Sequence, residues 1–487
     1  MRAQPAAVAV PSVEHGVLFP TFEFAVFFSV VFVLNWLLRP HPLAWRLFLL
    51  GASFVFYAAF EPVYCLLLAA SILVNQAFGV AIARQAHPGR RRALLAGAVV
   101  ANLAALGYYK YTDFFVESVG GALELVGIDT GWVPLGIVLP VAISFFTFQA
   151  LSYVIDIYRG HAEPSPLLDF AVYLSFFPHL VAGPIVRARE LLPQLTEHAD
   201  PRRVNAALAF RLIMAGLFKK VVISSFLSAA IVDDVFAVPE AHRSLEILVA
   251  VYAYAIQIYA DFSGYTDIAI GCALLLGLRF PQNFDAPYTA TSMQSFWRRW
   301  HMTLSFWLRD YLYIPLGGNQ GSRQWAFATL FLTMLIGGFW HGAAWTFLIW
   351  GAIHGLALAV ERRVLDGWAA AGKVPGPWSP VLRWLATFHV VCLAWIFFRA
   401  ESLGVAGTIL WRLVAAPGLG EAVTPMVLLV IAVSIGSQFV PTGWVDRAQA
   451  VFSRSAPAVQ AVALAVGLLF VDALGPEGVP PFIYFQF

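Results

Sequence analysis

Two histidines are the strongest candidates for chemistry, because each lies in a stretch where an ionisable side chain is costly. His341 lies in LIGGFWHGAAWTFLIWGAIHG, and His301 lies in FWRRWHMTLSFWLRD. An ionisable group inside a membrane segment costs a few kcal/mol, so it is a functional candidate by default. A neutral imidazole can take a proton from a hydroxyl and return it to a leaving group. The pair predicts acid–base chemistry at a buried site.

Small residues flank His341. Gly337, Gly338 and Gly342 allow close approach of another backbone or of a substrate. Trp345 is four residues further on, so a continuous helix places it on the same face as His341. The alternative is a histidine that only hydrogen-bonds a neighbouring helix.

His301 lies among aromatic and basic residues. On a helix, Trp297 and Ser305 share its face, while Arg298 and Arg309 point elsewhere. The alternative is an interfacial amphipathic helix with aromatic and arginine anchors. Metal binding by the two histidines is weakly supported, because the sequence has no HExxH motif and no cysteine close to either histidine. We therefore expect no metal.

Two further histidines are weaker candidates. His179 follows a proline in a broken apolar segment and could line the same cavity. His354 follows His341 by thirteen residues, about 220° around a helix, and is expected to face another way. For each, a structural role is the stronger interpretation.

Four charged residues in apolar stretches are expected to have structural roles. Asp261 and Asp267, in YADFSGYTDIAIG, are six residues apart and do not share a helix face. Paired charge within the membrane is the favoured interpretation, and orientation of a histidine is the alternative. Lys219 and Lys220, near the start of a span, could extend to the interface.

The composition identifies the class of chain that must position these groups. Of 487 residues, 60% are hydrophobic and 12% are charged, whereas soluble domains carry about 25% charged residues. Apolar runs of about 20 residues, each able to cross roughly 30 Å of hydrocarbon, recur along the chain. The formal net charge of +2 gives no basic surface of the kind that binds nucleic acid, so a nucleic-acid-binding protein is excluded. We predict an all-α, polytopic membrane protein.

Eleven apolar stretches are candidate membrane spans. Basic residues cluster in the connections near 39–46 and 84–92, which predicts a cytoplasmic location for both connections and an outer location for the N-terminal side. The candidate spans are 17–38, 43–60, 62–83, 93–110, 133–157, 205–231, 245–276, 325–360, 381–398, 424–440 and 457–474.

Two segments fit neither a span nor a loop. Residues 171–186 are apolar but broken by prolines, and residues 291–319 are aromatic but charged. Irregular or charged backbone at membrane depth is tolerated where protein or a water-filled cavity surrounds it. We predict that both segments are re-entrant or buried helices around a polar interior, within a single membrane domain, 1–487.

The aromatic segment, residues 480–487 with the sequence PPFIYFQF, is too apolar to be left in water. It is expected to insert into protein or membrane. Tyr484 provides its one side-chain hydroxyl, and an interfacial anchor is the alternative role.

Five motifs, taken together, resemble the bacterial membrane-bound O-acyltransferases. The branch that O-acetylates alginate is the most similar, and the D-alanyl transfer proteins of teichoic acid synthesis are more distant. The similarity runs from about residue 20 to the end of the sequence. The motifs are SFFTFQALSYVIDIYRG, FFPHLVAGPIVR, YADFSGYTDIAIG, FWRRWHMTLSFWLRDYLYIPLGGN and FWHGAAWTFLIWGAIHG.

The resemblance implies a ring of about 11 transmembrane helices around a thinned centre, with a tunnel from the cytoplasm to the outside. It implies that His341 is the catalytic general base and that His301 orients the donor or stabilises the oxyanion through its N–H. Tyr484 would be an acyl relay. The possible tunnel-lining residues are His179, Trp297, Asp310 and Trp345.

The resemblance also implies the substrates, partners and location. Acetyl-CoA or another cytoplasmic donor would supply the acetyl group in the bacterial inner membrane. An extracytoplasmic partner of the SGNH, esterase-like type would pass it to an exopolysaccharide such as alginate. Two alternatives stay open: transfer of D-alanyl or another acyl group by the same fold, and a small-solute transporter or channel.

Overall fold

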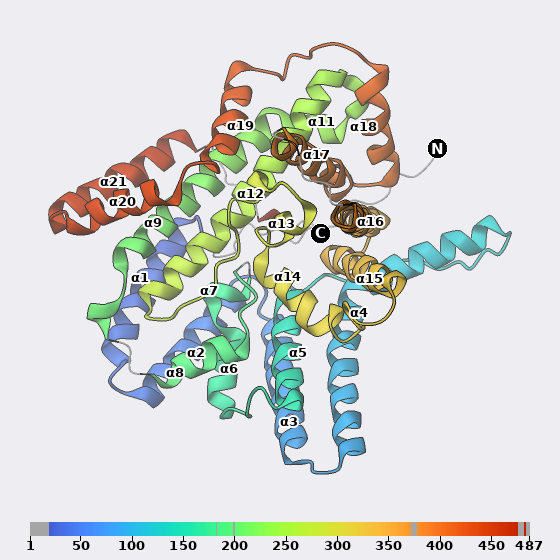
Figure 1. Cartoon of the computed structure of the whole chain (residues 1–487). Coiled ribbons are helices and arrows are strands. Elements are labelled where there is room, and N and C mark those ends of the chain that lie inside the picture. Colours follow the sequence, from blue (N-terminus) through green and yellow to red (C-terminus); the bar gives the residue numbers. More distant parts are fainter. Residues whose placement is uncertain are drawn as a thin grey trace. The chain divides into compact units, whose positions relative to one another are not determined.

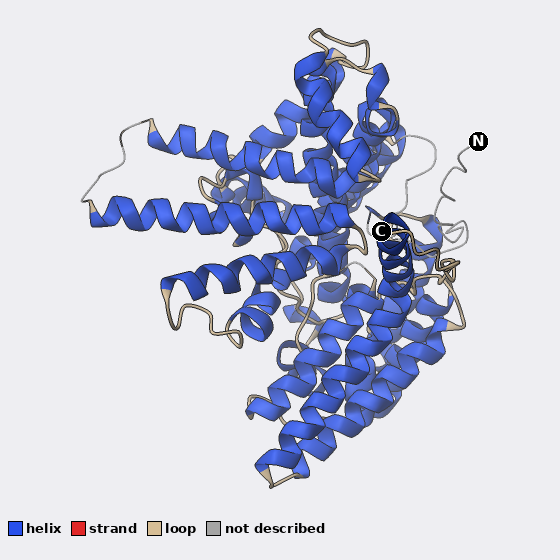
Figure 2. Cartoon of the chain, turned by 90° about the vertical axis from the view of Figure 1, so that its right-hand side faces the viewer, coloured by secondary structure: helices blue, strands red, loops and turns tan. Residues whose placement is uncertain are grey.

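The computed structural model describes residues 19–181, 183–197, 200–371, 376, 378–475 and 482–483. Every regular element in this described part is a helix (Figure 2). Five helices are long and apolar enough to cross a membrane, and a bent pair raises this number to six. The prediction of an all-α, polytopic membrane protein is confirmed, while the ring of about 11 helices stays a prediction. The five helices are Tyr64–Arg84, Pro88–Leu125, Ser244–Leu275, Ser379–Arg399 and Pro457–Leu474.

The chain forms two compact units, and a single domain therefore stays a prediction. The first unit consists of the described residues up to Asn205 together with Cys272–Phe280. Its helices, labelled in Figure 1, are α1 (Phe22–Leu38), α2 (Pro42–Ala58), α3 (Tyr64–Arg84), α4 (Pro88–Leu125), α5 (Ile143–Arg159), α6 (Leu167–Ser175), α7 (Phe177–Leu180) and α8 (Ala188–Thr196).

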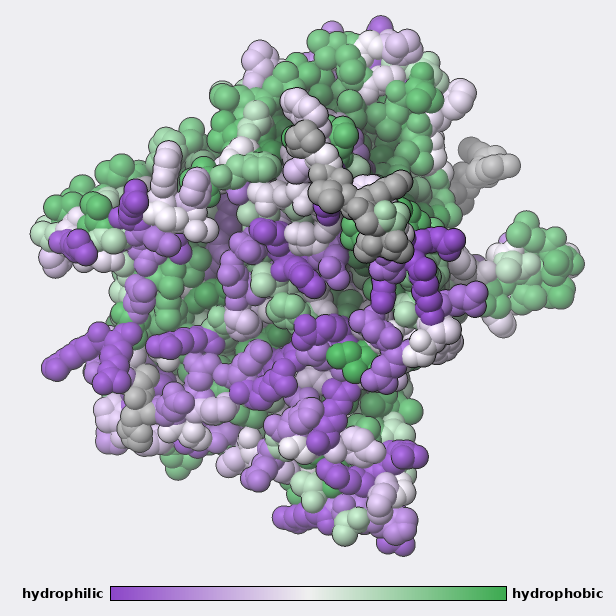
Figure 3. All heavy atoms as spheres, viewed as in Figure 1, coloured by the Kyte–Doolittle hydropathy of each residue, from purple (hydrophilic) through white to green (hydrophobic). Residues whose placement is uncertain are grey.

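The predicted span 133–157 is only partly helical, because α5 begins at Ile143. Pro134 and Pro140 lack an N–H donor and disfavour helix in the residue before each of them. Asp113, on α4, instead accepts the backbone N–H groups of Leu135 and Ile137, at 2.8 and 2.9 Å. Helix α4 is also longer than predicted, and apolar side chains cover its projecting end (Figure 3).

The second unit consists of Ala206–Gly271 and the described residues from Pro281 to Ile483. Three π-helical turns interrupt its α-helices: η3 (Phe218–Ser224), η4 (Ser228–Val232) and η7 (Arg309–Tyr313). Its α-helices are α9 (Ala206–Leu217), α10 (Ser225–Leu227), α11 (Asp233–Ala237), α12 (Ser244–Leu275, whose last turn belongs to the first unit), α13 (Met293–Trp297), α14 (Met302–Leu308), α15 (Arg323–His341), α16 (Trp345–Ala370), α17 (Ser379–Arg399), α18 (Leu403–Ala415), α19 (Pro425–Ser437), α20 (Thr442–Arg454) and α21 (Pro457–Leu474).

Both unusual segments are broken into short helices. Residues 171–186 contain the end of α6 and the single turn of α7, and the side chains of 171–180 are buried. Residues 291–319 contain α13, α14 and the π-turn η7. Both segments contain short helices, while their assignment as re-entrant or buried segments around a polar interior stays a prediction.

The candidate span 325–360, which is longer than one crossing needs, is broken into two helices. Helix α15 ends at His341, Gly342 is extended, and α16 begins at Trp345 and packs back along α15. Two glycines allow this close contact. A Cβ atom at Gly338 would lie 2.4 Å from the carbonyl oxygen of Phe347 and 2.9 Å from the Cα of Gly351. The helical hairpin therefore depends on the absence of a side chain at this position.

Gly338→Ala should destabilise the protein, because the new methyl group meets backbone that cannot move aside; overpacking of this kind costs about 1–3 kcal/mol. The measurement is the apparent melting temperature of the purified protein in detergent. The control is Gly407→Ala in α18, where a Cβ atom would meet nothing within 4 Å. An equal melting temperature for Gly338→Ala and the unmodified protein would contradict the tight hairpin.

Candidate active site

The backbone at His301 breaks the helix that the sequence predicted. Helix α13 ends at Trp297, α14 begins at Met302, and His301 adopts a left-handed conformation with φ of 41°. Such a conformation costs a non-glycine residue about 1–3 kcal/mol and persists only where the surroundings enforce it. The shared helix face of Trp297, His301 and Ser305 is therefore wrong, although the Ser305 hydroxyl still donates to the Trp297 carbonyl oxygen at 2.8 Å.

Asn283 enforces the backbone conformation at His301. Its carbonyl oxygen accepts the N–H of Met302 at 2.9 Å. Its side-chain Oδ1 accepts the backbone N–H of Thr303 at 3.2 Å and the Thr303 hydroxyl at 2.8 Å. The Nδ1 atom of His301 lies 3.1 Å from the same Oδ1 atom. One asparagine thus fixes three consecutive residues at the start of α14.

These contacts also determine which ring nitrogen of His301 carries the proton. A backbone N–H can only donate, so the Asn283 atom that faces Thr303 must be the amide oxygen rather than the amide nitrogen. An amide oxygen can only accept, and His301 Nδ1 must therefore carry hydrogen. In the neutral ring, the other nitrogen, Nε2, then holds a lone pair. His301 presents a proton acceptor on its far side.

The far side of His301 faces an aromatic wall. The ring is buried, and its Nε2 atom has no hydrogen-bond partner among the described residues. The ring centroid lies 4.6 Å from that of Phe262 and 6.5 Å from that of Trp340. A buried acceptor without a partner is costly and calls for a functional explanation.

His341 belongs to the same aromatic cluster. It is the last residue of α15, is 4% exposed, and lies 5.0 Å from the ring of Trp350 and 5.3 Å from that of Phe398. Trp340 precedes it directly and contacts both His341 and His301. The structure therefore brings together the two histidines that the sequence singled out.

His354 lies in this cluster too, contrary to prediction. The prediction assumed one continuous helix from His341, but the break after His341 places His354 on α16. Its ring lies 4.7 Å from Trp350 and 5.1 Å from Trp297. It is fully buried, and neither ring nitrogen has a hydrogen-bond partner in the described part of the chain.

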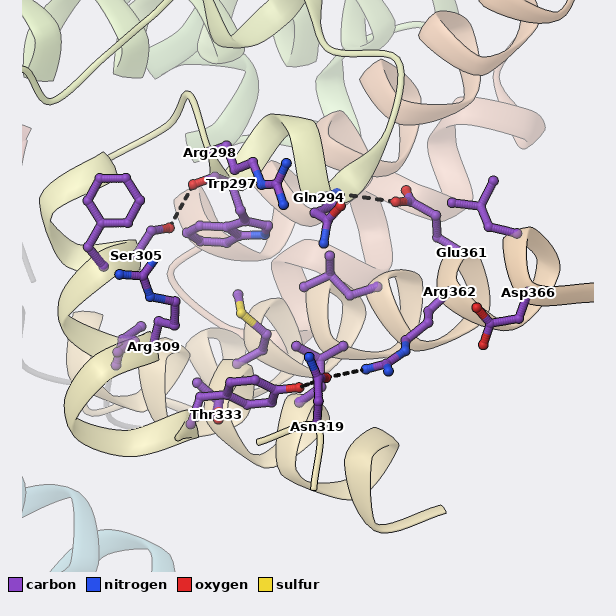
Figure 4. Close-up of a pocket in the computed structure, with 17 residues that line it drawn as sticks. Gln294, Trp297, Arg298, Ser305, Arg309, Asn319, Thr333, Glu361, Arg362 and Asp366 are labelled. Atoms are coloured by element: carbon purple, nitrogen blue, oxygen red, sulfur yellow. Dashed lines mark hydrogen bonds between the residues drawn. The ribbon is translucent and has the colours of Figure 1, made fainter. Parts of the chain in front are cut away.

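A cavity of about 610 Å³ adjoins the cluster (Figure 4). This volume is in the range of small-molecule sites, which is about 300–1,000 Å³. Trp297 and Ser305 are in its wall, whereas neither His301 nor His341 lines it. Arg298 and Arg309 were expected to point elsewhere, but both line the cavity, because the break at His301 reorients α14 relative to α13.

The electrostatics of the cavity favour an anion. Besides Arg298 and Arg309, its charged lining residues are Arg362, Glu361 and Asp366. The Glu361 carboxylate accepts backbone N–H groups at the start of α13, and Asp366 pairs with an arginine outside the lining, at 3.3 Å. Arg298 has no ion-pair partner among the described residues, so its charge is available to a ligand.

The remaining candidate lining residues have different positions. Trp345 starts α16 and is 54% exposed, so it does not share a helix face with His341. Asp310 does not line the cavity and accepts from Arg309 at 2.7 Å. His179 lies in the first unit, where its Nε2 donates to the Tyr173 carbonyl oxygen at 2.8 Å. Tyr484 lies outside the described residues.

Within the described residues, no three His, Cys, Asp or Glu side chains come together in a way that could hold a metal ion. The chemistry that this site offers is proton transfer by imidazole and anion binding by guanidinium.

Comparison with known proteins identifies the family. Residues 158–399 match the family described as MBOAT, membrane-bound O-acyltransferase. The chain is 44% identical to the probable alginate O-acetylase AlgI of Pseudomonas aeruginosa, over 76% of this chain and 69% of the relative. It is 38% identical to the peptidoglycan O-acetyltransferase of Helicobacter pylori, over 80% and 78%. It is 28% identical to the teichoic acid D-alanyltransferase of Bacillus subtilis, over 55% and 70%.

The chain belongs to the membrane-bound O-acyltransferase family and is an O-acyltransferase. The predicted class of membrane enzyme is therefore confirmed. The roles of individual site residues stay predictions.

Sequence reasoning missed several residues of this site. Asn283 lies in a short connection with no periodicity, so nothing marked it as a partner of His301. In the sequence, Glu361 and Arg362 lie directly after the predicted span 325–360. They line the cavity because α16 packs back along α15. Gly342 was noted for close approach, and as a helix-ending residue it was the one available signal for that hairpin.

Asn283→Leu should reduce acyl transfer by about 10²-fold, the usual scale of a lost acid–base contribution. Without the amide oxygen, His301 loses its fixed orientation. Asn283→Asp keeps an acceptor at the same position and should retain most of the activity. The measurement is acyl transfer per molecule of folded protein, with folding checked by gel filtration. Equal activity of the Leu and Asp variants would contradict the positioning role of Asn283.

Proposed function

We propose that the protein moves an acetyl group from a cytoplasmic donor to an extracytoplasmic partner, which O-acetylates an exopolysaccharide such as alginate. The observation that carries the proposal is a two-histidine cluster adjoining an arginine-lined cavity. Relatives named alginate O-acetylase and peptidoglycan O-acetyltransferase support acetyl as the transferred group. The first of these names supports alginate as the acceptor, and the second makes peptidoglycan the alternative.

The cavity is the proposed donor site. Acetyl-CoA carries phosphates, and guanidinium groups bind phosphate through charge-assisted hydrogen bonds. Arg298, Arg309 and Arg362 line one cavity. Arginine enrichment is typical of the cytoplasmic side of a membrane protein, which supports entry of the donor from that side. The small acetyl group, but not the charged coenzyme, would continue inward.

The chemistry proposed is attack of a hydroxyl oxygen on the donor's thioester carbonyl. His341 takes the hydroxyl proton as the C–O bond forms, and returns it to the thiolate sulfur as the C–S bond breaks. His301 presents a lone pair at Nε2, so we assign it to accept a hydrogen bond from the coenzyme thiol once the thiolate has been protonated, which orients the departing product. This replaces the N–H donor role that the family resemblance suggested.

Indole N–H groups can stabilise the tetrahedral oxyanion in place of His301. The Nε1 atoms of Trp297 and Trp350 are buried and have no acceptor among the described residues. Indole N–H is a donor only, so both are suited to a developing negative charge. Trp297 lies between the cavity and Trp350, and Trp350 contacts His341. We assign movement of Trp297 as the step that admits the acetyl group.

The other parts of the proposal come from the family resemblance. Tyr484 is kept as an acyl relay, an SGNH, esterase-like protein as the extracytoplasmic partner, and the bacterial inner membrane as the location. The apolar helices and the family membership support a membrane location in general.

His341→Ala should abolish acetylation of the polymer, because no other base replaces the imidazole; a lost general base costs about 10²–10⁴-fold in rate. The measurement is the release of acetate from isolated polysaccharide by mild alkali. His389→Ala is the control, since His389 is exposed on α17 and bonds Tyr252. Retained acetylation in His341→Ala, at normal protein levels, would remove His341 from the catalytic role.

Arg298→Gln should raise the KM for acetyl-CoA by about tenfold or more, the scale of one lost hydrogen bond to a charged group, with little change in kcat. Arg299 is the matched control, because it is adjacent in sequence but lies 3.7 Å from Asp285 and does not line the cavity. Steady-state kinetics of purified protein would measure both variants. Similar KM values for the two variants would contradict the donor site.

A further inference from the structure

A buried ion pair in the second unit has a third partner. Lys220, on the π-turn η3, pairs with Asp261 on α12, and both side chains are almost fully buried. Lys219 pairs with Asp267, six residues further along α12, so the expectation of paired charge is confirmed and that of lysines extending to the interface is wrong. Close approach of two glycines, Gly216 and Gly264, brings these elements together.

The pair is a poor device for stability alone. Removing two charges from water is costly, and apolar residues of similar volume often stabilise a protein as well or better. The Asp261 carboxylate has a further use. Its Oδ1 atom faces Lys220 and, at 3.4 Å, the Ser224 hydroxyl, while its Oδ2 atom accepts the backbone N–H of Ile483 at 3.0 Å.

Phe482, which precedes Ile483, is held at this point by side-chain contacts. Phe482 is buried, with its ring 4.6 Å from that of Tyr265 and 5.6 Å from that of Phe262. Phe262 also contacts the His301 ring, at 4.6 Å. A single phenylalanine, Phe262, therefore lies between Phe482 and His301.

We propose that the Lys220–Asp261 pair is a docking site for Phe482 and Ile483, the described residues of the aromatic segment, and holds these two residues near His301. Asp261 is the positioning residue: Lys220 keeps its carboxylate charged and oriented, and the free oxygen receives the backbone of Ile483. The inference deepens the proposed function, because Tyr484 follows Ile483 directly in the sequence. The docking itself needs no acyl chemistry.

The test measures exposure of the segment by alkylation. Ile483→Cys is introduced into the full-length protein after replacement of the three native cysteines, and its rate of reaction with N-ethylmaleimide is followed. The docking site is then removed with the pair Lys220→Met and Asp261→Leu, which leaves no unpaired buried charge. Labelling at position 483 should become about tenfold faster or more, the scale of a lost hydrogen bond to a charged group.

Two controls separate docking from general loosening. Lys219→Met with Asp267→Leu removes the neighbouring ion pair, whose carboxylate makes no described hydrogen bond to Phe482 or Ile483. A second background keeps only Cys392, which is buried in α17 and reports loosening elsewhere. The docking site is supported if labelling at position 483 becomes faster when Lys220 and Asp261 are replaced, but not when Lys219 and Asp267 are replaced. Labelling of Cys392 should stay unchanged.

Two results would overturn it: unchanged labelling at position 483 without the pair, or equal acceleration at 483 and at Cys392. Because alkylation requires no acyl donor, this outcome is independent of whether the protein transfers acetyl groups.

Discussion

The side-chain oxygen of Asn283 is the contact on which the proposed site most depends. In an apolar interior, a polar group without a partner is costly. A hydrogen bond made there therefore fixes the conformation and the protonation of the groups that share it. Asn283 accepts hydrogen bonds from the Thr303 N–H and the His301 Nδ1–H. These bonds hold the left-handed backbone conformation of His301 and fix the tautomer of its ring. The lone pair that results at Nε2 makes His301 a hydrogen-bond acceptor.

The same constraint explains how the surroundings are built. Aromatic rings pack around both His301 and His341, and a ring face offers only weak interactions to an imidazole. Charge is placed beside this cluster rather than in it, at Arg298 and its neighbours in the cavity. In the proposed mechanism, anion binding and proton transfer are separate, and Trp297 contacts both regions.

Much of this could be predicted from sequence, because apolar length and isolated histidines are local signals. The helical class and the break in segment 291–319 follow from such signals, whereas the catalytic roles of His301 and His341 stay predictions. The positions of His354 and Arg298 do not, since both depend on where a helix breaks. Asn283, eighteen positions away in the chain, enforces the left-handed conformation of His301. The spacing of residues along a helix cannot predict such a contact.

The central claim is that an acetyl group, and not its carrier, passes through this protein. Proteoliposomes loaded with acetyl-CoA labelled in both the acetyl group and the adenine, and supplied outside with the extracytoplasmic partner and polysaccharide, test it most directly. We predict that acetyl label reaches the outer polymer while adenine label stays inside. Appearance of intact coenzyme outside, or of no acetylated polymer while the partner is active, would contradict the account.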